Sequence, residues 1–538
     1  MRDSLGRIDW KLLVFLLLFL NVKMVIKLIA IIIIYILQPD LRFGFRFKNS
    51  RLPLFYIIVI VISVFNLIIP QLFTNLHYDL VFITGISFWT LSILAIHQIK
   101  LSVDKNDTET IHQTLLYFFL INIIISLIMY AGIIWETGTI NPFQYQGEFE
   151  KYFMSTGDYI KGVTVDTSTT NAIINAFGVF YFLQRKNVIC CLLCMIVLLL
   201  TGSNIINIIF CLVLIYVFIF QSTKDQKSVL IVCAMFLVIF LAKISPQNKN
   251  YLAENYTKYF EHSNPTIQSE KSTDKLIQKN AVLTEDDIKQ KIAREILDSI
   301  NNINSQKTHY KIIGNIKPSL VSQITAKPEI PVPNNNFLIF QYKDDTTATQ
   351  RKLLQYIAIN KSTLPLSGKE NSVAVKYPGK IIAFKQTENY FCQNPSKIIT
   401  GAGIGNFSSK LAFRSTALNI AGGYPEKYSY LNNDFKINHW DLYLYYFSKH
   451  DRIHSLVNSP FSIYDQLLTE YGLLGLLSFF IFYISFFARN LKYLTYGIPV
   501  LLIMMGAFFI DYWFEQLSVV IVFELLLLLN IKETTPKH

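Results

Sequence analysis

Side chains that can take up a proton or hold an anion gather just before an apolar segment that begins near residue 464. This stretch contains His450, Arg452 and His454, and in a helix the two histidines would share one face. His454 is therefore a candidate base and Arg452 a candidate anion ligand. The histidine pair could also begin a metal site, but the missing third ligand and the intervening arginine argue against a metal. A solvated surface histidine is the plain alternative.

Other charged residues add to this set. Arg414 has a planar guanidinium that suits the oxygens of a phosphate, and Lys151 and Lys161 are weaker candidates in an earlier polar loop. Glu470 lies inside the start of the apolar segment, where an ionisable group is a functional candidate by default. It could orient a base or a second substrate. The alternatives to these functional roles are a surface ion pair for Arg414 and a place in the headgroup layer for Glu470.

Aromatic residues crowd the same polar stretch. They could stack on sugar rings, or they could form an aromatic belt at a membrane interface. The run comprises Tyr424, Tyr428, Tyr430, Trp440, Tyr443, Tyr445, Tyr446 and Phe447.

Composition decides what kind of scaffold carries these residues. The chain has 538 residues, of which 52% are hydrophobic and only 16% charged, and its mean hydropathy is +0.36. These values exclude a disordered chain, a fibrous repeat and an ordinary soluble enzyme. The net charge of +12 fits basic residues at cytoplasmic helix ends, so no nucleic-acid partner is expected. The six cysteines form no disulfide framework, because five lie in apolar spans and Cys392 is alone.

Apolar runs predict an all-α integral membrane protein with about twelve spans, none of them a cleaved signal peptide. The expected spans are 11–22, 24–38, 53–69, 79–97, 113–134, 169–184, 188–200, 204–220, 228–242, 464–487, 493–511 and 516–531.

Lysine and arginine in the short loops predict the orientation. Alternation of the spans places every short basic loop on one side, together with both termini, and that side should be cytoplasmic. The acidic loop 135–168 and the long insert that starts at 243 then lie on the opposite face. A bacterial inner membrane with a large periplasmic loop is the expected setting.

The chain divides into four expected parts. Residues 1–242 form an N-terminal transmembrane bundle of about nine spans, and 464–538 supply about three more. Residues 243–395 read as a periplasmic α+β insert module, and 396–463 as a periplasmic loop of catalytic type, rich in Gly, Asn and Tyr. No nucleotide-binding loop and no Cys/His metal spacing is present, so neither a cofactor nor a metal is expected.

Three segments, in this order and on this topology, resemble the O-antigen ligase and O-antigen polymerase family. The first, 200–203 (LTGS), is like that family's T-G-S-R turn before a helix. The second, 401–407 (GAGIGNF), is like its G-x-G-x-G-N-F segment and contains Gly401, Gly403, Gly405 and Asn406. The third begins at 458–464 (NSPFSIY) and continues with Gln466, Leu467, Leu468, Glu470, Gly472 and Gly475, like P-H-N-x-x-L-x-x-x-x-E-x-G-x-x-G.

The resemblance implies a metal-independent glycosyl transfer at the outer face of an inner membrane. The donor would be a glycan on polyprenyl pyrophosphate, and the acceptor a hydroxyl on lipid A core, on another glycan or on a protein. In the family, arginines hold the pyrophosphate and a histidine in the third motif assists the acceptor. Here Asn204 stands at the arginine position and Phe461 at the histidine position, and Phe461 cannot accept a proton.

Because of these departures, either another residue supplies the base, for which His454 is the candidate, or the mechanism does not need a base at this position. Arg414 is the best candidate ligand of the pyrophosphate. A transporter or flippase of lipid-linked glycan is the alternative function. Transporters tend to show repeated halves and interrupted helices, and the sequence shows no such repeat.

Overall fold

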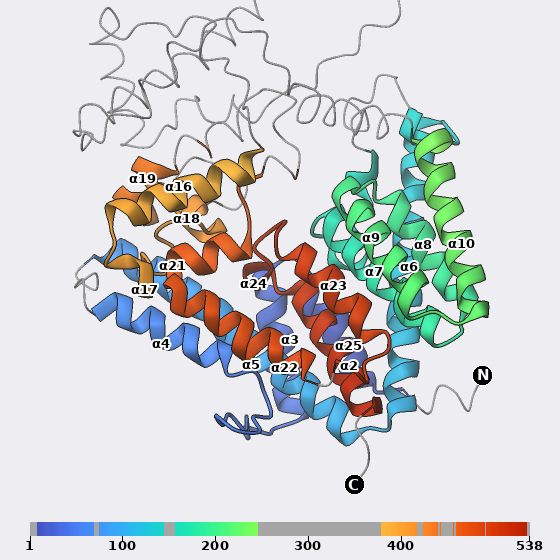
Figure 1. Ribbon diagram of the computed structural model, residues 1–538, viewed down its shortest axis with the longest axis horizontal. Helices are drawn as coiled ribbons and strands as arrows, with labels where there is room; N and C mark the ends of the chain where they lie inside the picture. The colour runs from blue at the N-terminus through green and yellow to red at the C-terminus, as the bar shows by residue number, and fades with distance from the viewer. Residues whose placement is uncertain are drawn as a thin grey trace, which may run out of the picture. The chain divides into compact units, whose positions relative to one another are not determined.

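The computed structural model describes residues 8–68, 75–144, 156–245, 378–416, 423–439, 442, 456, 459–489 and 491–534. Within these residues the chain is helical and contains no strand (Figure 1). The α-helices of eight residues or more are α2 Trp10–Phe19, α3 Met24–Leu37, α4 Phe55–Ile68, α5 Leu76–Lys105, α6 Thr108–Thr137, α7 Ser168–Gln184, α8 Val188–Leu200, α9 Asn204–Phe220, α10 Lys224–Ile239, α16 Gly379–Gln393, α21 Ile463–Ser478, α23 Gly497–Ala507 and α25 Ser518–Thr534. Shorter ones are α17 Lys397–Thr400, α18 Lys410–Arg414, α19 Asn433–Asn438, α22 Ser485–Ala488 and α24 Trp513–Gln516.

Four helical segments are long and apolar enough to cross a membrane, so the all-helical prediction is confirmed for the described residues and these segments are compatible with a membrane protein. They are Leu76–Lys105, Thr108–Thr137, Lys224–Ile244 and Ile463–Ala488, the last two of which continue through π-helical turns. A helix also covers most of each of the other eight expected spans, but these helices have only 10 to 17 residues. Twelve crossings therefore stay a prediction.

Local capping signals explain where several of these helices begin and end. The side chain of Thr167 accepts a hydrogen bond from the Thr170 amide at the start of α7, and Thr223 and Gln226 form a capping box at the start of α10. The last turn of α6 closes on Gly138 in the left-handed conformation.

The chain forms two compact units. The first comprises residues 1–251, 394–411 and 461–538 and holds all of the long apolar helices. Its central element is α25, whose residues from Ser518 to Asn530 are all buried, as expected for a helix that is apolar on every side. Helix α25 packs against α5, α7 and α23 (Figure 1).

The described part of the second unit, which comprises residues 252–393 and 412–460, is a small helical cluster. Helix α16 packs against α19, where Tyr390 donates a hydrogen bond of 3.4 Å to Asp434. The side chains of His439 and Gln386 hydrogen-bond at 2.7 Å. Residues 378–395 of the expected insert are mainly helical, while 246–377 lie outside the described residues, so the expected α+β module stays a prediction.

Candidate functional site

Helix α21 is interrupted at Gly472, and the glycine-rich segment docks into the break. Gly472 has φ +68° and ψ −170°, so the carbonyls of the preceding turn lose their helical donors. Residues 401–407, called the glycine loop below, supply the replacement: the Ala402 amide donates to the Thr469 carbonyl at 2.8 Å and the Gly403 amide to the Glu470 carbonyl at 2.9 Å. The second and third motifs of the sequence therefore form one structural unit.

This docking depends on the absence of side chains at two glycines. A Cβ atom on Gly401, which has φ +82°, would lie 2.4 Å from the carbonyl carbon of Glu470. A Cβ atom on Gly472 would lie 2.2 Å from the carbonyl oxygen of Ile399. The two backbones approach too closely for any other residue type, and the positive φ angles would also strain an L side chain.

Two carboxylates of α21 hold the end of the glycine loop and the residue that follows it. Glu470 is fully buried, and its two oxygens accept from the Gly405 amide at 2.8 Å and from the Phe407 amide at 3.1 Å. Asp465 accepts from the Ser408 hydroxyl at 2.6 Å. The carboxylate of Glu470 is thus occupied by backbone donors, and its observed contacts are those of a positioning residue.

Glu470→Gln tests this positioning role. A glutamine keeps one acceptor oxygen and places an NH₂ group against a backbone N–H, so we expect a loss of about 2 kcal/mol in stability. The thermal unfolding midpoint of the purified chain in detergent should fall accordingly. Glu388→Gln is the matched control because Glu388 is exposed on α16, and it should leave the midpoint unchanged. An equal midpoint for both variants would contradict the assignment.

The glycine loop leads directly to a cation. Lys410 begins α18, and its ammonium lies 4.0 Å from a carboxylate oxygen of Asp511 and 5.8 Å from the ring centre of Phe461. Asp511 follows the end of α23 and is also bound by the Tyr512 amide at 2.7 Å and by the Gln516 side chain at 2.8 Å. Phe461, at the position where the resembled family has histidine, therefore lies beside Lys410, and its ring packs at 5.1 Å against that of Tyr512, the residue after Asp511.

A second carboxylate, Asp166, is influenced by the charges of Lys410 and Asp511. It precedes α7 and accepts a hydrogen bond of 3.1 Å from the Thr170 hydroxyl. Burial raises the pKa of Asp166 above its usual range, the nearby Lys410 ammonium opposes this rise, and the Asp511 carboxylate adds to it. Lys410, Asp511 and Asp166, called the charged site below, thus interact electrostatically although they come from three distant parts of the sequence.

The buried Lys27 adds positive charge to this region. Its ammonium donates to the Phe19 carbonyl at 2.7 Å and to the Ser518 hydroxyl at 3.2 Å, and the side chain is only 2% exposed. Lys27 also interacts electrostatically with Asp166. Such an ionisable group within an apolar helix is uncommon and makes Lys27 a candidate functional residue.

The structure describes only some of the predicted site residues. His454, Arg452 and Lys151 lie outside the described residues. Arg414 ends α18, one helical turn after Lys410, and is half-buried. Lys161 lies in the loop before α7, where its charge lowers the pKa of Asp158 against the stronger effect of burial.

Gly401, Gly403, Gly405 and Asn406 are brought together, but all four are buried. The amide side chain of Asn406 donates to the Ala402 carbonyl at 2.9 Å and to the Tyr78 hydroxyl at 3.2 Å. With these donors used inside the protein, the observed contacts of the glycine loop position Lys410. A direct contact of the loop with a substrate stays a prediction.

The first motif lies at a turn between α8 and α9, as expected. A Cβ atom on Gly157 would lie 2.3 Å from the Thr201 carbonyl oxygen, so the loop 156–165 packs directly on this turn. The same loop is held by the Asn122 side chain, which accepts from the Val163 amide at 3.0 Å. The first motif therefore supports the segment that leads to Asp166.

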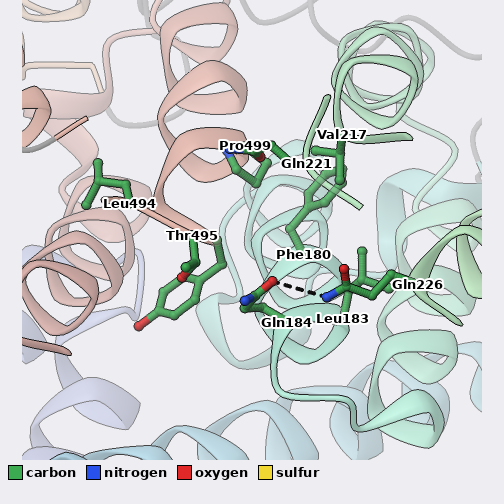
Figure 2. Close-up of a pocket in the computed structure, with 10 residues that line it drawn as sticks. Phe180, Leu183, Gln184, Val217, Gln221, Gln226, Leu494, Thr495 and Pro499 are labelled. Atoms are coloured by element: carbon green, nitrogen blue, oxygen red, sulfur yellow. Dashed lines mark hydrogen bonds between the residues drawn. The ribbon is translucent and has the colours of Figure 1, made fainter. Parts of the chain in front are cut away.

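A cavity of about 200 Å³ lies elsewhere, at the end of α23 opposite Asp511 (Figure 2). Gln184, Gln226, Gln221 and Thr495 contribute its polar side chains, and Gln226 donates to Gln184 at 3.2 Å. Phe180, Leu183, Val217, Leu494, Tyr496 and Pro499 complete the lining. None of the predicted site residues borders this cavity.

Sequence reasoning missed the charged site. It gave no role to Lys410, Asp166 or Asp511, although Asp511 is only 8% exposed. A usable signal existed, because Lys410 comes three residues after Phe407 and Asp166 comes directly before a span.

Four of the five cysteines expected in apolar spans are buried, as predicted, and Cys211 is partly exposed.

Comparison of the whole chain with known protein families, with characterised proteins and with solved structures finds no match. Among the described residues, no group of three His, Cys, Asp or Glu side chains could hold a metal ion. The functional assignment therefore depends on the charged site and on the three motifs.

Proposed function

We propose that the protein transfers or polymerises oligosaccharide carried on polyprenyl pyrophosphate, at the periplasmic face of a bacterial inner membrane. One observation supports this most directly. The glycine loop, docked on α21, presents Lys410 beside Phe461, and the Lys410 ammonium lies 4.0 Å from a carboxylate oxygen of Asp511. The three segments that resemble O-antigen ligases and polymerases thus surround or support a site that holds a cation and carboxylates.

Each residue of the charged site has a role in this proposal. The acceptor hydroxyl oxygen bonds to the anomeric carbon while the bond from that carbon to the pyrophosphate oxygen breaks. The hydroxyl proton passes to Asp166, and the negative charge that develops on the leaving pyrophosphate faces Lys410. Asp511 holds the Lys410 ammonium in place. Asp166 takes the part that the family gives to a histidine, because burial raises its pKa toward neutral pH and makes it a better base.

The acidic limb of the pH–rate profile tests the role of Asp166. A raised pKa means that Asp166 is protonated, and the base lost, at a higher pH than for an ordinary aspartate, and activity recovers as the pH rises. Asp511→Asn removes a charge that raises this pKa, so the limb should move to lower pH. Lys410→Gln removes a charge that lowers it, so the limb of the residual activity should move to higher pH. Shifts in the same direction would contradict the proposal.

The proposed function itself is tested by the surface glycan of a strain that lacks the gene, separated by chain length. Complementation would use the wild type, Lys410→Gln and Arg414→Ala. Long chains that collapse to a single repeat would indicate a polymerase, and loss of the capping glycan with accumulation of lipid-linked donor would indicate a ligase. An unchanged ladder would refute a role in that glycan.

One observation favours the alternative, a transporter or flippase of lipid-linked glycan. Interrupted helices are common in transporters, and α21 is interrupted at Gly472. The two functions can be distinguished in vesicles that contain the purified protein and lipid-linked donor. A flippase would move the donor across the bilayer without changing it, whereas a ligase would consume the donor when a separate acceptor is present and a polymerase would consume it without one.

A further inference from the structure

The cavity at the opposite end of α23 from the charged site has no part in the proposed function. We propose that it binds the glycerol and ester region of an anionic glycerophospholipid from the adjacent leaflet. The proposal is independent of glycosyl transfer, and its evidence is the lining of the cavity, the charges next to it and the exposed apolar residues beside it.

The lining suits the middle part of a lipid molecule. Phe180, Val217 and Pro499 offer apolar contacts, while Gln184, Gln221 and Thr495 bring amide and hydroxyl groups (Figure 2). Ester carbonyls accept hydrogen bonds and adjoin methylene groups, so a glycerol diester matches both kinds of wall. At about 200 Å³ the cavity holds only part of a lipid, and the rest of the molecule must lie outside it.

Amide groups are available in the lining. Gln226 uses its side chain in the capping box of α10 and in its hydrogen bond to Gln184. The side chain of Gln221 makes no hydrogen bond with any residue that the structure describes, and Gln221 is half-buried. An amide held in a cavity without a protein partner is a ready donor for an ester carbonyl.

Positive charge lies next to the cavity along the chain. Arg185 and Lys186 follow Gln184, and Gln226 lies in the segment 224–227, which contains two lysines and Asp225. Arg185 is paired with Glu109 at 3.1 Å, whereas Lys186 and Lys224 are exposed and form no ion pair within the described part of the chain. This end of the bundle therefore favours an anionic headgroup over a zwitterionic one.

Exposed apolar residues beside the cavity provide a place for an acyl chain. Ile219 and Phe220, the last residues of α9, are 59% and 72% exposed and directly precede Gln221. A lipid whose glycerol region sits against Gln221 can lay its acyl chain on this surface. A soluble phosphate ester would leave the same surface uncovered.

Binding to the purified full-length chain in detergent, measured by native mass spectrometry, tests the proposal. We expect phosphatidylglycerol to bind at least about fivefold more tightly than phosphatidylcholine, because only the former carries a net charge for the lysines to attract. The double variant Lys186→Gln/Lys224→Gln should abolish this preference. Lys48→Gln, a charge change in the loop between α3 and α4, is the matched control and should keep it.

A second variant tests the cavity itself. Gln221→Trp should fill the space and weaken the binding of both lipids, while the thermal unfolding midpoint without added lipid shows whether the variant folds. Equal affinity for the two lipids, a preference that survives the double lysine variant, or unchanged binding by Gln221→Trp would each overturn the proposal. Displacement of the lipid by millimolar glycerol 3-phosphate would also overturn it, in favour of a soluble phosphate ester.

Discussion

Lys410→Gln is expected to lower glycan transfer by roughly 10²- to 10³-fold, the usual effect of removing one group that stabilises developing negative charge. Lys410 is the cation that the glycine loop presents, and its side chain is 17% exposed, so its charge is poorly screened by solvent. Glutamine keeps a similar length but cannot neutralise a leaving pyrophosphate. The measurement is the initial rate of transfer from purified lipid-linked donor to acceptor in detergent.

Two further variants sharpen this test. Lys410→Arg keeps the positive charge and should retain much of the activity, although the guanidinium has a different shape. Lys397→Gln removes a charge from α17, the short helix just before the glycine loop, and should stay within about threefold of the wild type because Lys397 is not part of the charged site. If Lys410→Gln were as active as Lys397→Gln, the charged site would not be the site of transfer.

The helical scaffold was the part of the structure that the sequence predicted well. Apolar runs placed a helix at every expected span, because the lengths and flanks of such runs depend on local composition. The number of true crossings was less predictable, since helices such as α2 and α23 have only 10 and 11 residues. Whether a short apolar helix crosses depends on tilt and neighbours rather than on its own residues.

The charged site could not be predicted from the sequence in the same way. The three residues of the charged site lie far apart in the sequence, and only tertiary packing brings the charges of Asp166, Lys410 and Asp511 together. The glycine loop illustrates the same limit: its glycine pattern suits either an anion-binding loop or a close backbone approach, and in the structure the glycines permit a close approach to α21 and are buried. A glycine pattern alone does not separate these two uses.

Gly472→Ala is expected to destabilise the protein by about 3 kcal/mol and to abolish transfer. The new methyl group would lie 2.2 Å from the Ile399 carbonyl oxygen and 2.6 Å from the Gly401 amide nitrogen, both of which are backbone atoms that cannot move aside independently. To relieve this clash, the glycine loop must leave the break in α21. Lys410 would then lose its place beside Phe461 even in molecules that remain folded.

Gly132→Ala is the control for this prediction, because Gly132 lies inside α6 with no atom within 4 Å of the added Cβ. Alanine is the better helix former, so the unfolding midpoint of this variant should stay the same or rise slightly. The two variants add the same methyl group to helices of the same bundle, and only the first blocks a docking site. Equal midpoints and equal transfer rates would mean that the glycine loop does not need the break at Gly472, and that another element positions Lys410.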